Sequence, residues 1–302
     1  MVILMFNEIS RRNLLAAAAT TAFFAPYVKA AESTPITGPR GIRQGRLQQS
    51  VMSSVWGTLQ LTMEERCEIL STLGFAGMDL PSENDFAMLE DYGLKPAMMT
   101  GTGTSFENGL IRKENHDAIE AATLAGIDMC VRGGCKNLIA LPGERRGMSS
   151  EEGAANIIEI FKRVAPYAQE KGVNICMEIT NSKVVADNRT DQMFNNVFWG
   201  FDICTAVGSP NIKIVYDIYH VQIMHGDVVR TLRDNLDKVC HIHVAGVPSR
   251  NEIDDSQELN HRFIARSIAD MGYEGFVAHE WRPAPGRNPL LSLATAFEIM
   301  VV

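Results

Sequence analysis

The sequence has no basic stripe interleaved with aromatic side chains, the feature by which nucleic-acid-binding surfaces are identified. Its 28 lysines and arginines are outnumbered by 36 acidic side chains, and the formal net charge is −8. An acidic surface repels phosphate backbones. We therefore expect no nucleic-acid partner for this chain.

The sequence also lacks a CxxC pair and any dense cluster of cysteines, which excludes a disulfide-rich scaffold. Oxidation after export would permit disulfides, but the spacing does not indicate which residues would pair. We expect buried thiols, with Cys130 and Cys135 as the exception. The six cysteines are Cys67, Cys130, Cys135, Cys176, Cys204 and Cys240.

A glycine-rich phosphate-binding turn is missing as well. An open, doubly wound α/β sheet that binds a dinucleotide carries such a turn after an early strand. The segment Gly101-Thr102-Gly103 follows the third predicted strand and is too short to serve as one. This absence favours a closed arrangement of strands over an open sheet.

The apolar run near the N-terminus, residues 16–25, is too short to span a bilayer comfortably. It follows Arg11 and Arg12 and precedes small residues at the usual processing positions, an order typical of a twin-arginine export signal. We predict a signal peptide over residues 1–30 and a flexible lead-in over residues 31–46. The mature protein would then be periplasmic or otherwise exported and would have no membrane segment. An uncleaved amphipathic N-terminal helix is the alternative.

From residue 47 onward, short β-like segments alternate with longer segments of helical period. Removing 30 of the 302 residues leaves 272, near the usual length of one α/β barrel. Eight alternations predict the α/β class and a single (β/α)₈ TIM barrel over residues 47–302. The predicted strands are residues 48–55, 76–80, 95–100, 137–141, 173–179, 212–216, 239–244 and 275–279.

Two of the predicted helices begin with a recognisable capping pattern. Thr62 with Glu65, and Ser149 with Glu152, match the capping box, in which side chains satisfy the free amides of the first turn. Residues 154–168 place their apolar side chains on one face, as expected for a helix that covers a barrel.

Four metal-ligand side chains stand at or near the ends of four consecutive predicted strands: Glu178, Asp217, His243 and Glu280. The carboxyl ends of barrel strands meet at one mouth, so these side chains should converge. Three carboxylates and one imidazole favour Mg²⁺ or Mn²⁺, with Co²⁺ or Zn²⁺ as further candidates. His241 precedes His243 by two residues in the same predicted strand, so its side chain should also point into the barrel, one layer below the mouth. We expect it to support a ligand and not to bind the metal.

Each of these residues alone has an ordinary explanation, since an acid at a strand end is usually a helix cap or a salt-bridge partner. His220, three residues after Asp217, could hydrogen-bond a substrate oxygen or be a satisfied loop histidine. Arg250 could hold a substrate carboxylate or hydroxyl, or form a surface ion pair. Trp56 could be an apolar wall of the pocket or part of the core.

The second half of the chain resembles the hydroxypyruvate isomerase family, within the xylose-isomerase-like TIM-barrel superfamily. The resemblance implies a divalent cation on the four strand-end residues, and it implies that Glu178 and Glu280 act as base and acid. The motifs that carry it are Met177-Glu178-Ile179-Thr180-Asn181, Tyr216-Asp217-Ile218-Tyr219-His220-Val221-Gln222, His241-Ile242-His243-Val244-Ala245, Pro248-Ser249-Arg250-Asn251-Glu252, and Gly272-Tyr273-Glu274-Gly275 leading to Glu280.

The implied reaction is an isomerisation of a small hydroxy-carbonyl compound through an enediolate, with hydroxypyruvate and tartronate semialdehyde as the leading pair. His243 and the export signal depart from the family pattern, where glutamine is often found at that ligand position. Both departures favour the alternative function, which is epimerisation or isomerisation of a sugar or keto-sugar. A non-catalytic periplasmic sugar-binding module is the alternative of another class, and a homo-oligomer is compatible with this kind of barrel. The seven histidines are too few for a DNA-repair endonuclease of the superfamily.

Overall fold

A computed structural model describes residues 36–37, 42–43, 45–184 and 190–302 of the chain. The predicted signal peptide and most of the predicted lead-in lie outside these residues. Two short strands, β1 (Ile36–Thr37) and β2 (Ile42–Arg43), pair in antiparallel fashion ahead of the main sheet. Among the helices within the described ranges, none combines the length and the apolar character that a bilayer span requires.

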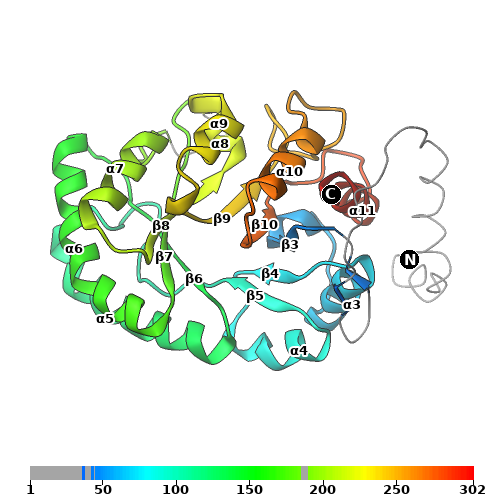
Figure 1. The fold of residues 1–302 in the computed structure, drawn as a ribbon, viewed down its shortest axis with the longest axis horizontal. Helices are drawn as coiled ribbons and strands as arrows, with labels where there is room; N and C mark the ends of the chain where they lie inside the picture. Colours follow the sequence, from blue (N-terminus) through cyan, green and yellow to red (C-terminus); the bar gives the residue numbers. More distant parts are fainter. Residues whose placement is uncertain (1–35, 38–41, 44, 185–189) are drawn as a thin grey trace.

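Eight parallel strands form one sheet in the order β5-β4-β3-β10-β9-β8-β7-β6. Met99 joins the two outer strands, because its N–H donates to Asn137 O and its carbonyl accepts from Ile139 N–H, both at 2.9 Å. The sheet therefore nearly closes into a barrel (Figure 1). The strands are β3 (Gln48–Val51), β4 (Gly77–Asp79), β5 (Lys95–Met98), β6 (Asn137–Ala140), β7 (Asn174–Glu178), β8 (Ile212–Asp217), β9 (Val239–Val244) and β10 (Phe276–His279).

Helices follow the strands in alternation and surround the sheet, as Figure 1 shows, which confirms the predicted (β/α)₈ architecture. The α-helices are α3 (Met63–Leu73), α4 (Phe86–Asp91), α5 (His116–Gly133), α6 (Ser150–Lys171), α7 (Val197–Val207), α8 (Ile218–Met224), α9 (Val228–Arg233), α10 (His261–Asp270) and α11 (Pro289–Met300). Short 3₁₀ helices occupy η2 (Ser53–Trp56), η3 (Glu83–Asp85), η4 (Lys113–Asn115) and η6 (Leu236–Lys238).

Alternation along the strands divides the apolar side chains into two layers. In β8, Ile214 and Tyr216 pack in the large core shared with the helices, and the Tyr216 hydroxyl donates to Val228 O of α9 at 2.9 Å. Val215 belongs instead to the small cluster inside the barrel. The next residue of the same parity is Asp217, so the alternation that fills the interior also directs this carboxylate inward at the strand end.

The predicted helix starts are borne out in detail. Thr62 and Glu65 form the complete capping box of α3. At α6 the Glu152 N–H donates to Ser149 Oγ at 3.1 Å, which is the first half of such a box. The apolar face predicted for residues 154–168 is buried along α6, so this helix covers the barrel as expected.

The first strand is shorter than predicted. Strand β3 ends at Val51, and residues Ser53–Trp56 form the 3₁₀ helix η2. Val51 and Val55 are both buried, and a spacing of four residues suits a helical turn as well as a strand. The prediction of a strand over residues 48–55 was therefore wrong in its second half.

The cysteine pairing also differs from the expectation. Cys130 and Cys135 are buried free thiols. Cys176 of β7 and Cys240 of β9 form a disulfide, with their Cα atoms 6.7 Å apart. The two cysteines are 64 residues apart in the sequence, and the fold brings them together because β7 and β9 lie on either side of β8. No local spacing in the sequence predicts this pair.

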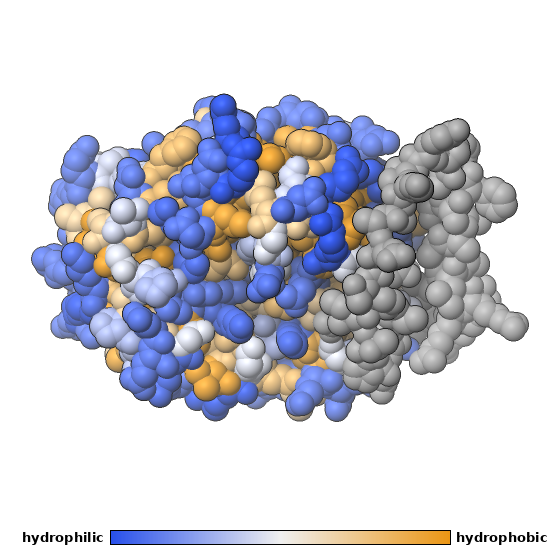
Figure 2. Space-filling view, in the orientation of Figure 1, coloured by the Kyte–Doolittle hydropathy of each residue, from blue (hydrophilic) through white to orange (hydrophobic). Residues whose placement is uncertain are grey.

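The surface seen in Figure 2 carries hydrophilic and hydrophobic residues in a mixed pattern, without one dominant apolar area. The large apolar side chains that are exposed belong to different helices: Val131, Phe198, Phe263 and Leu291. Single exposed apolar residues of this kind are normal for a folded protein.

The stability of the fold should fall in mild acid because of His261, the first residue of α10. Burial lowers the pKa of His261 from 6.5 to about 4. Between pH 6.5 and pH 4 the unfolded chain therefore binds more protons than the folded one, and the free energy of unfolding decreases as the pH falls. The loss should approach about 3 kcal/mol at the lower end of this window.

Urea unfolding at several pH values checks this prediction, with His261→Gln as the matched variant. The variant lacks the titrating ring, so its stability should change less between pH 6.5 and pH 4 than that of the wild type. Identical slopes in the two proteins would contradict the prediction, whatever the absolute stability of the variant.

Candidate metal centre

The four strand-end residues predicted as ligands converge at the barrel mouth. Each of Glu178, Asp217, His243 and Glu280 offers one donor atom, and these atoms all lie within 4.8 Å of one another. Glu178 and Asp217 end β7 and β8, His243 lies within β9, and Glu280 directly follows β10. The first three are buried and Glu280 is partly buried.

Hydrogen bonds of the secondary structure hold two of these residues in place, Asp217 through its side chain and Glu280 through its main chain. Asp217 is the N-cap of α8, where its Oδ1 accepts from the N–H of Tyr219 at 2.8 Å and of His220 at 3.3 Å. The Glu280 N–H donates to Val244 O at 3.0 Å, which continues the pairing of β10 with β9. Asp217 is therefore a helix cap, as an acid at a strand end often is. Only Oδ1 has this role, and Oδ2 faces Arg250 and His220.

His243 lies at the centre of the cluster. Its Nδ1 is 2.8 Å from Glu280 Oε2 and 3.0 Å from Glu178 Oε1. Burial would lower the pKa of His243, but the negative charge of Glu280 and bonds to Asp79, Glu178 and Glu280 raise it well above its usual value. The imidazole thus faces two carboxylates with the same nitrogen.

Burial and like charges oppose full ionisation of the cluster. Burial raises the pKa of Asp217 to about 8, and the negative charges of Glu280 and Glu178 add to this, while Arg250 and His243 oppose it. Burial also acts against ionisation of Glu280, but Arg250 and His243 hold the pKa of Glu280 well below its usual value. A buried carboxylate that is pushed toward its neutral form is one that a cation would stabilise.

The donor set fits a divalent cation. Two atoms that each lie about 2.0–2.3 Å from one ion are separated by up to about 4.6 Å, close to the spread of these donors. Three carboxylates and an imidazole suit Mg²⁺, Mn²⁺ or Zn²⁺. The convergence of four donor atoms within 4.8 Å of one another, with Asp217 held toward its neutral form, favours an ion here.

His220 faces the cluster from α8. Asn181 Nδ2 lies 2.8 Å from His220 Nδ1 and donates to it, which leaves the ring proton on Nε2. That nitrogen lies 3.4 Å from Asp217 Oδ2. His220 is 1% exposed and accepts a bond from Asn181, which fits the alternative of a satisfied histidine, and its contact with a substrate oxygen stays a prediction.

Arg250 also reaches the cluster. Its Nη2 lies 2.9 Å from Glu280 Oε2 and 3.3 Å from Asp217 Oδ2, and its guanidinium carbon is 5.1 Å from the centre of the Tyr219 ring. The side chain is buried, so the surface ion pair considered from sequence is wrong as an explanation. Its backbone has a φ of 55°, and its N–H donates to Gly246 O at 2.8 Å.

The turn that carries Arg250 should not tolerate a side chain at position 246. A Cβ on Gly246 would collide with the carbonyl oxygen of Glu252, which is backbone and cannot move alone. We expect Gly246→Ala to lower the free energy of unfolding by about 1–3 kcal/mol, the usual range for overpacking, and to displace Arg250. Urea unfolding checks the stability, and Gly226→Ala serves as a control because nothing lies within 4 Å of a Cβ there.

Gly226 has a φ of 71°, so Gly226→Ala carries a backbone strain that Gly246→Ala does not. A loss of stability in Gly246→Ala no larger than in Gly226→Ala would contradict the prediction.

Trp56 and His241 occupy different surroundings. Trp56 is 2% exposed in the core, with the Arg66 guanidinium carbon 5.9 Å from the centre of its ring, which suits the packing role. Its role as a wall of the substrate pocket stays a prediction. His241 points inward as expected, and its Nε2 lies 2.7 Å from Asp79 Oδ2.

Sequence reasoning missed Asp79. This residue ends β4, lies within the barrel interior and contacts His243 Nε2 at 3.3 Å. Burial opposes its ionisation, but His241 and His243 hold the pKa of Asp79 well below its usual value. The signal was present in the sequence, because Asp79 stands at a strand end in the same way as Glu178 and Asp217.

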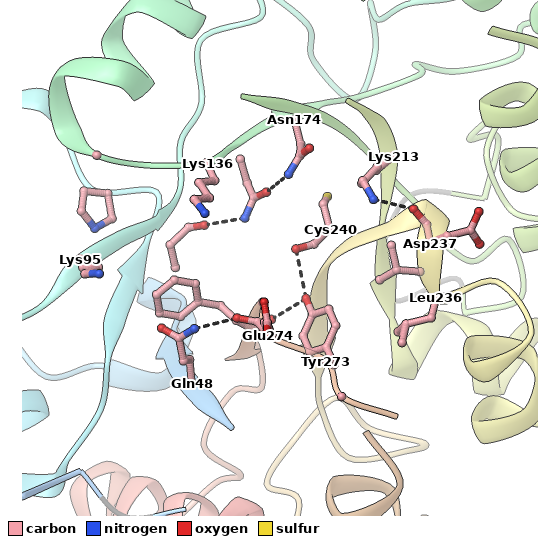
Figure 3. Close-up of a pocket in the computed structure, with 18 residues that line it drawn as sticks. Gln48, Lys95, Lys136, Asn174, Lys213, Leu236, Asp237, Cys240, Tyr273 and Glu274 are labelled. Carbon is pink, nitrogen blue, oxygen red and sulfur yellow. Dashed lines mark hydrogen bonds between the residues drawn. The ribbon is translucent and has the colours of Figure 1, made fainter. Parts of the chain in front are cut away.

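A separate cavity of about 590 Å³ lies at the opposite end of the barrel, around the first residues of the strands (Figure 3). There the Tyr273 hydroxyl donates to Cys240 O at 3.1 Å, and Gln48 Nε2 donates to Glu274 O at 2.7 Å. The chemistry of TIM barrels is placed at the carboxyl end of the strands. This cavity is therefore not the candidate site.

A family model described as "Xylose isomerase-like TIM barrel" matches residues 68–298 of the chain. Among curated proteins, a 2-oxo-tetronate isomerase of Cupriavidus necator is 34% identical over 137 residues, which are 44% of this chain and 50% of that protein. A "Putative hydroxypyruvate isomerase" of Mus musculus is 42% identical over 81 residues, 27% of this chain and 29% of that one. The chain thus spans about half or less of the length of these two relatives.

Solved structures share the fold. A 3-keto-D-glucoside 4-epimerase from E. coli, YcjR, superposes with a TM-score of 0.70 at 16% identity, over 84% of this chain and 98% of that one. The IOLI protein, in a crystal structure with a bound zinc atom, superposes with a TM-score of 0.64 at 15% identity, over 84% and 95% of the two chains. At these identities the likeness establishes the architecture alone.

Proposed function

Because the chain belongs to the xylose isomerase-like TIM barrel family, we propose that it is a metal-dependent isomerase of small hydroxy-carbonyl compounds. The leading reaction is the interconversion of hydroxypyruvate and tartronate semialdehyde. The observation that carries the proposal is the convergence of Glu178, Asp217, His243 and Glu280 at the carboxyl ends of four consecutive strands.

The two glutamates would move the proton. In this reaction a C–H bond of the hydroxyl-bearing carbon breaks, a C–H bond forms at the neighbouring carbonyl carbon, and a hydroxyl proton passes between the two oxygens. One of Glu178 and Glu280 takes the first proton, and the other supplies the second. A divalent cation held by the four residues would supply positive charge for the enediolate that forms between the two steps.

Arg250 and His220 would hold the substrate. Both are buried beside the ligands: Arg250 Nη2 donates to Asp217 Oδ2 at 3.3 Å, and His220 Nε2 lies 3.4 Å from the same oxygen. With Asp217 holding a cation, the N–H groups of Arg250 and His220 would be available to a substrate oxygen. The forked guanidinium of Arg250 suits the carboxylate that hydroxypyruvate carries.

The names of the two curated relatives support this substrate class. Hydroxypyruvate and 2-oxo-tetronate are both carboxylates with a carbonyl group beside a hydroxyl-bearing carbon. The same proton transfer would serve either compound, and they differ in length by one carbon. The proposal therefore extends to 2-oxo-3-hydroxy acids of three or four carbons.

Incubation in D₂O with each of the two acids tests the proposal. Protein loaded with Mg²⁺ or Mn²⁺ should convert hydroxypyruvate to the aldehyde and 2-oxo-tetronate to the isomeric 3-ketone, and should place one deuterium on the carbon that was the carbonyl. Glu274→Gln, a carboxylate at the opposite end of the barrel, is a matched control that should keep full activity. No product and no deuterium with either acid would overturn the substrate assignment.

Epimerisation or isomerisation of a larger sugar is the second candidate, favoured by His243 at the third ligand position. A screen of ketoses and keto-sugars for deuterium exchange at one carbon would detect it. A non-catalytic sugar-binding module would instead bind a ligand tightly and exchange no deuterium. These three outcomes separate the candidate functions in one set of measurements.

We also propose that the protein is exported by the twin-arginine route. The support is the order of charged, apolar and small residues within positions 10–30 of the sequence. Expression in bacteria followed by fractionation tests this proposal. Arg11→Lys together with Arg12→Lys should retain the protein in the cytoplasm, and unchanged export of this variant would overturn it.

A further inference from the structure

A second group of buried polar side chains lies directly behind the candidate metal centre. Asp79 of β4 reaches across the barrel interior to β9, where its Oδ2 is 2.7 Å from His241 Nε2 and 3.3 Å from His243 Nε2. Its other oxygen accepts from the Ser50 hydroxyl of β3 at 2.6 Å. The side chains of Asp79, His241 and His243 are 0–1% exposed, so water does not compete for these contacts.

The two nitrogens of His243 face opposite groups. Nδ1 is directed at Glu280 and Glu178, which are the other candidate ligands, and Nε2 is directed at Asp79. A neutral imidazole carries one proton and one lone pair. If the proton is on Nε2, it lies between His243 and Asp79, and the lone pair on Nδ1 joins the ligand set.

Asp79, His241 and His243 could also be considered as a second ion site, because three of their donor atoms lie within 4.8 Å of one another. Such a site would share His243 with the first, so both ring nitrogens would have to be free of protons. A neutral imidazole always keeps one of them. Asp79 Oδ2 and His241 Nε2 lie within ion-pair distance at 2.7 Å, and the Ser50 hydroxyl donates to the other oxygen of Asp79, so protein groups already surround this carboxylate.

We propose that Asp79 is a positioning residue that holds the proton of His243 on Nε2, so that Nδ1 binds the metal ion. The inference rests on the proposed metal-dependent function. Ser50 and His241 orient the carboxylate, and Asp79 orients the imidazole. A carboxylate behind a ligand histidine raises the affinity for the metal by fixing both the tautomer and the ring orientation.

The first test uses the wild-type protein. ¹⁵N NMR of the Zn²⁺-loaded full chain reports which nitrogen of each histidine carries a proton. The expected spectrum has one metal-bound Nδ1, belonging to His243, whose partner Nε2 is protonated. Coordination through His243 Nε2 would overturn the proposal, and so would the binding of two Zn²⁺ ions per chain.

The second test uses Asp79→Asn, which keeps the shape of the side chain and removes its charge. Competition with a chelator should show a loss of Zn²⁺ affinity of about 10- to 100-fold. The exposed Asp202→Asn on α7 is the matched control and should bind as the wild type does. Unchanged affinity and an unchanged His243 spectrum in Asp79→Asn would overturn the proposal.

The two levels of the hypothesis fail in different ways. If the wild-type protein binds no divalent ion, the proposed function fails and the role of Asp79 fails with it. If the wild type binds one ion and Asp79→Asn binds it equally well, only the role of Asp79 fails. The NMR spectrum of the wild type decides the proposal even where the variant does not fold.

Discussion

Replacing Glu280 by glutamine should reduce turnover by about 10²–10⁴-fold, the usual contribution of a positioned general acid or base. Glutamine keeps the shape of the side chain and can still bond to Arg250, but it cannot take up or release a proton at neutral pH. Deuterium incorporation from D₂O should fall in parallel with product formation. Initial rates and mass spectrometry of the product measure both quantities.

Loss of the metal could mimic this effect, because Glu280 is also a proposed ligand. The metal content of the variant must therefore be measured beside its rate, and a variant that retains one ion per chain gives the decisive result. Glu178→Gln should behave in the same way, since the two residues share the proton transfer. A metal-loaded Glu280→Gln that exchanges deuterium at the wild-type rate would remove Glu280 from the mechanism.

The four predicted ligands could be found from sequence because their placement depends on local features. Each stands at or near the end of an apolar strand, and the carboxyl ends of barrel strands face one mouth by topology. Alternation along the strand then decides which side chains point inward. Glu178, Asp217, His243 and Glu280 meet both conditions, and so does Asp79, which was missed because only the last four strands were compared.

Other features of the site depend on contacts that no short segment contains. Arg250 reaches Asp217 and Glu280 because its backbone adopts a left-handed conformation in a turn that begins at Gly246. The sequence gives an arginine after a strand, which is equally compatible with a surface ion pair. The pairing of Cys176 with Cys240 likewise follows from barrel closure and not from spacing.

The limits of the strands were predicted less well than their number. Strand β3 stops four residues before the predicted end, since Val55 is buried in a 3₁₀ helix and not in the sheet. Burial of an apolar residue does not by itself distinguish a strand from a single helical turn. The ends of elements are for this reason the least predictable part of a barrel.

Removing the divalent cation should abolish turnover and lower the stability of the barrel. Burial and the neighbouring carboxylates Glu280 and Glu178 raise the pKa of Asp217, so a cation should make full ionisation of the cluster more favourable. An ion present at 100 times its dissociation constant would stabilise the folded state by about 2.7 kcal/mol. For a chain of this length, chelation should lower the melting temperature by about 5–10 °C.

Thermal unfolding with and without chelator measures this shift, and activity should return when Mg²⁺ or Mn²⁺ is added back. Asp217→Asn is the informative companion, because the amide removes one negative charge from the cluster and one ligand from the ion. Its melting temperature should respond little to the chelator, and its turnover should not be restored by added metal. If the wild type melts at the same temperature and turns over at the same rate with and without chelator, then Arg250 and the histidines alone stabilise the carboxylates at the barrel mouth, and the metal-dependent mechanism is wrong.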